Sequence, residues 1–98
     1  MLYGDSLMAG YGLTQNENLS SVLMNKIKKN YMDIDLINAS VSGNTSKDGL
    51  ARLKWSLDDK PAILVLCLGA NDMLRGINPT ITKANLNEII TQVKKKNI

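Results

Sequence analysis

The chain has 98 residues, 44% of them apolar and 21% charged, a length that fits one small domain. Its formal charge is +3, and aromatic residues make up only 4%, so we interpret its lysine clusters at positions 26–29 and 94–96 as solvated helix ends and not as a nucleic-acid surface. The chain contains no histidine, which excludes histidine-based acid–base chemistry and histidine metal sites built from these residues alone.

The first predicted elements are a short strand and an amphipathic helix. Leu2 and Tyr3 form the strand, and a loop of small and polar residues follows at positions 4–10. A capping-box pattern at residues 14–17 predicts the start of the helix. Apolar residues then recur at the spacing of one helical face, at Leu19, Val22, Leu23 and Ile27.

A second strand and helix are predicted next. Residues 34–37 form the strand, and a second polar loop covers residues 38–45. Residues 45–48 predict a helix start, and Leu50, Leu53 and Leu57 give the apolar stripe of the helix.

The third strand is predicted at residues 62–68, after Pro61. This run is apolar at every position, a pattern typical of a central parallel strand that is buried on both faces. Cys67 lies in this run, so we expect a buried, inert thiol. A third helix follows Pro79, with Thr80 and Thr82 as cap candidates and its stripe at Leu86, Ile89, Ile90 and Val93.

The alternation of three strands and three helices predicts an α/β fold with a parallel sheet, and residues 1–98 are expected to form one unit. With the flavodoxin-like strand order 2-1-3, right-handed crossovers place the first helix on one face and the other two on the opposite face. One helix cannot cover a whole face. The third strand would therefore expose either its odd-numbered or its even-numbered residues between 63 and 68, and we expect the isolated chain to be oligomeric or molten.

Polar residues follow all three predicted strands, where parallel sheets bind ligands. Ser6 is the candidate nucleophile, on a tight turn after Gly4. Acyl transfer also needs hydrogen-bond donors for the oxyanion, which the backbone N–H groups of Ser6 and Gly43 and the amide of Asn71 can supply. A base is lacking, because we interpret Asp5 as pointing away from Ser6 and Asp72 as capping or bracing its turn.

Three blocks of sequence resemble the GDSL/SGNH hydrolases. They are Gly4-Asp5-Ser6-Leu7, Asn38-Ala39-Ser40-Val41-Ser42-Gly43-Asn44-Thr45-Ser46 and Leu68-Gly69-Ala70-Asn71-Asp72. The similarity covers nearly all of the chain and is strongest to the bacterial thioesterase I, lysophospholipase L1 and arylesterase group. It implies a three-layer α/β/α sandwich with a mainly five-stranded parallel sheet.

The resemblance also implies an activity and its site. Ser6 corresponds to the nucleophile and one oxyanion donor, and Gly43 and Asn71 to the other two donors. The expected activity is hydrolysis of small-molecule or lipid acyl esters or thioesters through a serine acyl-enzyme, with no metal or organic cofactor. The segment that resembles the lining of the acyl groove, and is expected to bind substrate, consists of Leu74, Arg75, Gly76, Ile77, Asn78 and Pro79.

The chain also departs from the family's pattern. The family completes its triad with an Asp-x-x-His block, which these residues do not contain. We therefore expect a partial domain that is inactive alone. Asn44 stands where relatives often have Asp, and Met73 where they often have Gly. The alternative is a non-catalytic binding or dimerisation module, whereas Gly10-x-Gly12 lacks the third glycine of a dinucleotide loop.

No apolar run in the sequence is long enough to predict a transmembrane segment, and no signal-peptide pattern precedes the first block. Periplasmic or secreted relatives are common in the group that the sequence resembles. The compartment is therefore left open at this point.

Overall fold

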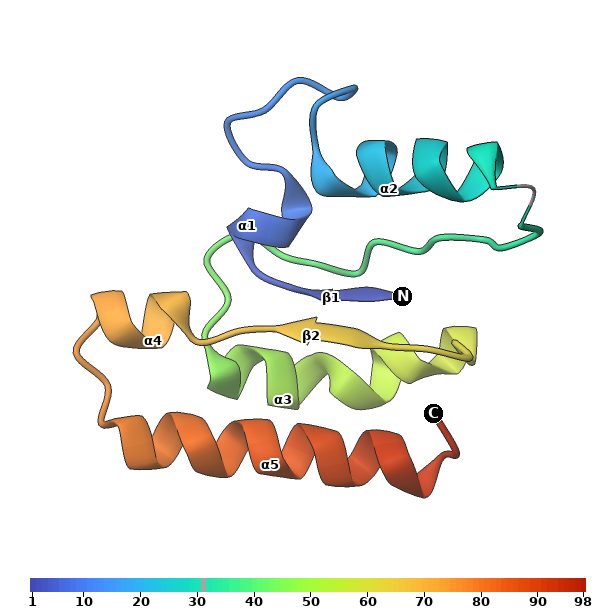
Figure 1. The fold of residues 1–98 in the computed structure, drawn as a ribbon. Helices are drawn as coiled ribbons and strands as arrows, with labels where there is room; N and C mark the ends of the chain where they lie inside the picture. The colour runs from blue at the N-terminus through green and yellow to red at the C-terminus, as the bar shows by residue number, and fades with distance from the viewer. Residues whose placement is uncertain (31) are drawn as a thin grey trace.

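The computed structural model describes residues 1–30 and 32–98 (Figure 1). Its elements, in chain order, are β1 (Leu2–Gly4), α1 (Ser6–Ala9), α2 (Leu19–Lys29), α3 (Ser46–Ser56), the 3-10 turn η1 (Leu57–Asp59), β2 (Val65–Cys67), α4 (Ala70–Leu74) and α5 (Pro79–Lys95). The predicted count of three strands and three helices is therefore wrong, since the described residues form two strands and five α-helices.

The sheet is parallel, as predicted, with β1 paired to β2 so that Leu2 lies opposite Val65 and Gly4 opposite Cys67. On the other side of β1 runs the segment 37–41, where the N–H of Leu2 donates to the carbonyl of Ile37 at 2.8 Å. The N–H of Val41 donates in turn to the carbonyl of Gly4 at 3.0 Å. The segment 37–41 thus lies on the side of β1 opposite β2, where the order 2-1-3 places the second predicted strand, but the sheet of the described residues has two strands only.

The second predicted strand does not form. Residues 34–37 form no strand, and a single parallel bridge joins Leu2 to Asn38. The physical reason is the length of β1, which has only three residues. Its hydrogen-bonding groups are opposite residues 37–41, so the residues before position 37 have no strand beside them.

The three long helices were predicted, but two of their caps were not. Asn18 caps α2 by accepting from the N–H of Ser21 at 2.9 Å. Thr14 instead donates to Glu17 at 2.8 Å within the preceding turn. In α5, the cap is Asn78, and the cap candidates Thr80 and Thr82 lie inside the helix. The side chain of Asn78, directly before the helix, accepts a hydrogen bond from the N–H of Thr80 in its first turn. Pro79 suits the first helical position, where its missing N–H costs no hydrogen bond.

The start of α3 follows the prediction. Thr45 and Asp48 form a complete capping box, in which each side chain accepts from the other residue's backbone N–H. The short helices α1 and α4 were predicted as loops, because a helix of four or five residues is too short to show an apolar stripe.

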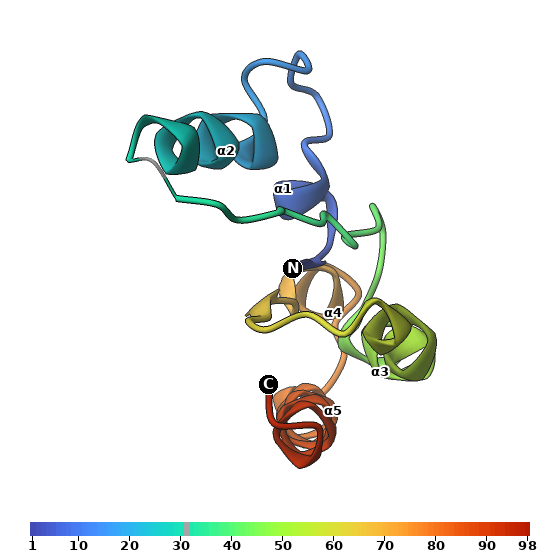
Figure 2. The same ribbon diagram turned by 90° about the vertical axis from the view of Figure 1, so that its right-hand side faces the viewer.

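Helices lie on both sides of the sheet, in the α/β arrangement that was predicted. In Figures 1 and 2, α2 lies on one side of the strands, and α3 and α5 lie side by side on the other. The core lies between the sheet and this second layer, and its buried residues are Met1, Tyr3, Leu53, Leu57, Ile89 and Val93.

One face of β2 is open. Ile63 is 70% exposed and Val65 45%, whereas Leu64, Leu66 and Leu68 pack against the core. The odd-numbered residues are thus the exposed set. Cys67 belongs to it and is exposed, so the prediction of a buried thiol is wrong. The apolar run predicted burial on both faces, but within the described residues helices cover this strand on one face only. No helix of the described residues is long and apolar enough to cross a membrane.

Candidate active site

Ser6 is the first residue of α1 and directly follows the turn after β1. It is half-buried, and Gly10 closes the helix in the left-handed conformation, with its N–H donating to the Ser6 carbonyl at 3.1 Å. The N–H groups in the first turn of a helix have no partner within that helix. The N–H of Ser6 is therefore available to a group outside α1.

Asp5 is a structural residue beside the candidate nucleophile. It is 1% exposed, and its Oδ1 caps α1 by accepting from the N–H of Leu7 at 3.0 Å. Its Oδ2 has no hydrogen-bond partner among the described residues. The capping contact agrees with the interpretation that Asp5 is not the base for Ser6.

Gly43 lies in an exposed turn after the segment 37–41, and its φ of +84° is a conformation that other residues rarely adopt. A Cβ at this position would meet no atom within 4 Å, so the backbone is open to a ligand. The turn is closed by the N–H of Asn44, which donates to the carbonyl of Val41 at 3.2 Å. Arg75 donates to the Gly43 carbonyl at 3.2 Å from the third loop.

Asn71 lies in α4, just after β2, and is half-buried. Its Nδ2 donates to the carbonyl of Asn44 at 2.9 Å. This contact joins the third strand-end loop to the loop of Gly43. Because a carboxamide nitrogen carries two hydrogens, one donor of Asn71 is left over after this bond.

Asp72 braces three helices. It is 2% exposed, and it accepts from the N–H and the hydroxyl of Ser46, both at 2.6 Å, and from the hydroxyl of Thr82 at 2.8 Å. Asn85 extends the network by donating to the Ser46 hydroxyl at 2.9 Å. The carboxylate thereby joins α4 to the start of α3 and to α5, so its bracing contacts are to other helices and not to the turn for which they were predicted.

The ionisation of Asp72 follows from these contacts. Burial raises the pKa of its carboxyl, but the hydrogen bonds from Ser46 and Thr82 lower it by more. The pKa therefore lies below its ordinary value, and Asp72 is a poor proton acceptor at neutral pH. The role of general base remains without a candidate among these residues.

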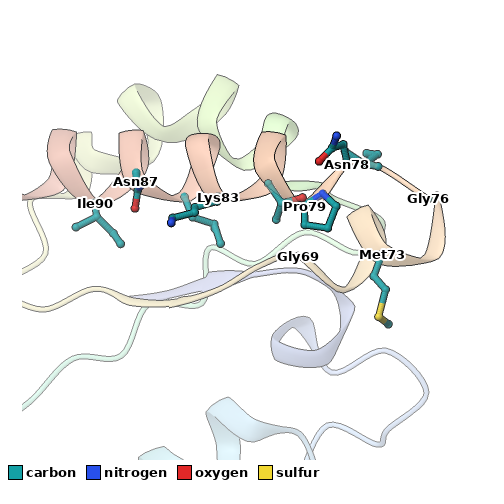
Figure 3. A pocket seen from close by; sticks show the side chains of 11 residues that line it. Gly69, Met73, Gly76, Asn78, Pro79, Lys83, Asn87 and Ile90 are labelled. Atoms are coloured by element: carbon teal, nitrogen blue, oxygen red, sulfur yellow. The ribbon is translucent and has the colours of Figure 1, made fainter.

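The segment predicted to bind substrate is divided between a cavity and the surface. Four of its residues, Gly76, Ile77, Asn78 and Pro79, line a cavity of about 780 Å³, together with Gly69, Met73 and residues of α5. Leu74 and Arg75 are outside its lining, and Leu74 is 77% exposed. Figure 3 shows Lys83, Asn87 and Ile90 extending from α5. Met73 extends from α4 and points away from α5.

This cavity is not the place where the candidate nucleophile lies, since its lining includes none of Ser6, Gly43 and Asn71. It adjoins the site through α4, because Gly69 and Met73 flank Asn71 in the chain. Among the described residues there is no group of three or more His, Cys, Asp or Glu side chains that could hold a metal ion.

Sequence reasoning missed one half-buried residue beside the site, Arg52 of α3. It lies between the stripe residues Leu50 and Leu53, so the helical pattern gave no signal for a functional cation. The position of Arg52 in the helix could have indicated a role, because an arginine next to an apolar stripe is partly buried and its N–H groups need acceptors.

The model of the GDSL-like Lipase/Acylhydrolase family matches residues 2–98. The chain is 39% identical over 95 residues to an arylesterase of Vibrio mimicus and 40% identical over 87 residues to the esterase TesA of Pseudomonas aeruginosa. It is 38% identical over 98 residues to thioesterase 1/protease 1/lysophospholipase L1 of Escherichia coli. These matches cover 96%, 88% and 99% of this chain, and 48%, 43% and 46% of the relatives, so the chain spans about half their length.

Solved structures of esterases have the same fold as this chain. The SGNH-hydrolase family esterase AlinE4 superposes with a TM-score of 0.93 at 39% identity, covering 99% of this chain and 53% of that one. The crystal structure of TesA gives a TM-score of 0.93 at 36% identity and covers 98% and 54% of the two chains.

Proposed function

This chain belongs to the GDSL-like lipase/acylhydrolase family, and we propose that it carries the nucleophile and oxyanion hole of a hydrolase of acyl esters or thioesters. Ser6 is the proposed nucleophile. The proposed oxyanion donors are the backbone N–H groups of Ser6 and Gly43 and the side-chain amide of Asn71. No metal or organic cofactor takes part in the proposed reaction.

The observation that carries the proposal is the convergence of three separate segments at one end of the sheet. Ser6 follows β1, Gly43 follows the segment paired with β1, and Asn71 follows β2. Hydrogen bonds from Arg75 to Gly43 and from Asn71 to Asn44 tie the second and third segments together. Donors held in place before the reaction stabilise an oxyanion without reorganisation during it.

The proposed chemistry has two steps. The Oγ of Ser6 attacks the acyl carbonyl while a base takes its proton, and the tetrahedral oxyanion accepts hydrogen bonds from the three donors. Collapse of this intermediate expels the alcohol or thiol, which receives the proton from the base, and leaves an acyl-serine. Water then attacks the acyl-serine by the same route and releases the carboxylic acid.

A serine hydroxyl is a weak nucleophile until a base takes its proton, and this sequence contains no histidine. We propose that the base and its orienting carboxylate come from residues outside these 98. In consequence, residues 1–98 alone are expected to be essentially inactive, and the activity belongs to the full-length protein.

The acyl chain is proposed to lie along the segment from Leu74 to Pro79. Its second half lines an apolar cavity next to α4, and its first half is on the surface near Asn71. An acyl group bound to Ser6 could thus extend past Asn71 towards Gly76 and Ile77. The choice between ester and thioester depends on the leaving group, which lies on the other side of the carbonyl.

The test is hydrolysis of p-nitrophenyl butyrate and of an acyl-coenzyme A by the full-length protein and its Ser6→Ala variant. We expect Ser6→Ala to lower kcat by at least about 1,000-fold, while the control Ser20→Ala on α2 keeps the activity of the parent. An organophosphonate should label Ser6 itself, as located by mass spectrometry. A full-length protein that hydrolyses neither substrate and takes no label would favour the alternative, a non-catalytic binding or dimerisation module.

A further inference from the structure

The guanidinium of Arg52 lies at the meeting point of the strand-end loops. Its Nε donates to Oδ1 of Asn44 and its Nη1 to the carbonyl of Ala39, both at 2.6 Å. Its Nη2 donates to the carbonyl of Gly4 at 3.2 Å. One side chain from α3 therefore contacts two segments that are far apart in the sequence, the end of β1 at Gly4 and the loop that contains Ala39 and Asn44.

Two of these acceptors, Gly4 and Asn44, are close in the chain to a proposed catalytic group. Gly4 is two residues before Ser6, and Asn44 directly follows Gly43. The carbonyl of Asn44 also accepts from the side chain of Asn71. Through Gly4 and Asn44, Arg52 links the residues that carry all three proposed oxyanion donors.

The position requires a guanidinium. Its Cζ lies 4.1 Å from the centroid of the Tyr3 ring, so the planar group stacks on an aromatic ring while its edge donates to three acceptors. None of these three acceptors is a carboxylate. The charge is therefore balanced by carbonyl dipoles and the ring, an arrangement that a lysine ammonium on a flexible stem cannot reproduce.

We propose that Arg52 is a positioning residue of the active site, which fixes the separation between the Ser6 turn and the Gly43–Asn44 turn. This inference rests on the proposed function. A displacement of about 1 Å in a catalytic group can lower a rate by about 100-fold. Loss of Arg52 therefore lowers kcat, because the donors lose their common support, and leaves KM nearly unchanged, because Arg52 does not touch the substrate.

The kinetic test compares Arg52→Gln and Arg52→Lys in the full-length protein with Lys54→Gln, an exposed residue of the same helix. We expect kcat to fall about 100-fold for Arg52→Gln and about 10-fold for Arg52→Lys, with KM changed by less than about threefold. Lys54→Gln should retain the kcat of the parent. A kcat within twofold of the parent for Arg52→Gln, or a loss carried mainly by KM, would overturn the proposal.

A double-mutant cycle separates positioning from general destabilisation. Asn44→Ala removes the side-chain acceptor of Arg52 but keeps the backbone carbonyl that Asn71 contacts. If Arg52 acts through Asn44, the double variant loses little more kcat than Arg52→Gln alone. Fully additive losses would contradict that route. Because Asn44→Ala keeps the other two Arg52 contacts, it remains informative if Arg52→Gln fails to fold.

A second readout does not depend on catalysis. The N–H groups of Ala39 and Val41 donate to the carbonyls of Leu2 and Gly4 in β1, and the N–H of Asn44 donates to the carbonyl of Val41, so the exchange of these amides with solvent deuterium should be slow. Arg52→Gln should speed it by about 10-fold, while the amides of α5 keep their rates. Unchanged exchange at these three amides would overturn the proposed support. Faster exchange in a protein that hydrolyses no ester would instead refute the proposed function and leave the structural role intact.

Discussion

The side chain of Asn71 donates a 2.9 Å hydrogen bond to the backbone carbonyl of Asn44, the residue that follows Gly43. The bond fixes the orientation of the amide before any substrate arrives. It also uses one of the two amide hydrogens, so the remaining one has a defined direction. An amide prepared in this way can stabilise an oxyanion at little further entropic cost.

Replacement of Asn71 tests this arrangement. We expect Asn71→Ala to lower kcat of the full-length protein by about 100- to 1,000-fold, as is typical for the loss of one oxyanion donor. Steady-state hydrolysis of p-nitrophenyl butyrate gives the measurement, with Asn25→Ala, an exposed asparagine on α2, as control. A kcat close to that of the parent would remove Asn71 from the site.

Gly43 offers a test with a closely matched control. Gly43 and Gly12 have φ values of +84° and +78°, and a Cβ on either would meet no atom within 4 Å. Alanine at either position should cost about 1 kcal/mol of stability through backbone strain alone. Only Gly43→Ala should also lower kcat, by about 10- to 100-fold, because the strain displaces the proposed donor N–H.

Urea unfolding and ester hydrolysis, measured on both glycine variants, separate the two effects. Equal losses of stability with unequal losses of kcat support a role for Gly43 in the site. If both variants lose the same fraction of activity, Gly43 acts only as a turn residue.

Asp72 should be important for stability. Asp72→Asn keeps the shape of the side chain but replaces one acceptor oxygen by a donor, which opposes the N–H or the hydroxyl of Ser46. Hydrogen bonds to charged groups contribute about 1.5–3 kcal/mol, so we expect a loss in that range by urea unfolding. Asp58→Asn, at an exposed carboxylate of η1, should unfold like the parent.

The same carboxylate gives a pH dependence with a defined sign. The pKa of Asp72 is lower in the folded state than in the unfolded chain, so the unfolded state takes up its proton first as the pH falls. The stabilisation is fully present above the unfolded value of about 3.9 and is lost as the pH falls through the folded value. Urea midpoints at pH 7, 4 and 3 should fall more steeply for the parent than for Asp72→Asn.

Apolar spacing in the sequence predicts the three long helices, because each has a stripe long enough to be recognised. The strand positions were harder to predict. Residues 34–37 have strand-like composition, yet pairing is decided by the partner, and β1 is opposite residues 37–41. The composition of one segment does not specify which of its residues pair with the neighbouring strand.

The candidate site residues could be predicted because each follows a strand predicted from the sequence, and the carboxyl ends of parallel strands meet at one edge of the sheet. The contacts that hold the site in place could not be predicted from the sequence. The contacts of Arg52 with Gly4 and of Asp72 with Ser46 span 48 and 26 positions in the chain. Such pairs depend on how α3 and α4 pack, which no local pattern specifies.

The open face of β2 leads to the last prediction, which concerns residues 1–98 as an isolated polypeptide. Ile63, Val65 and Cys67 present an apolar row on a strand whose only partner among the described residues is β1. The exposed apolar face and the unpaired edge of β2 both favour contact with other chains. Analytical ultracentrifugation should therefore show self-association, and Val65→Lys should reduce it by placing a charge in the row. Ile81→Lys, at an exposed position on α5, should associate like the parent. A parent polypeptide that is monomeric, with a sharp unfolding transition, would contradict this prediction, since the sheet would then be stable with its apolar face in water.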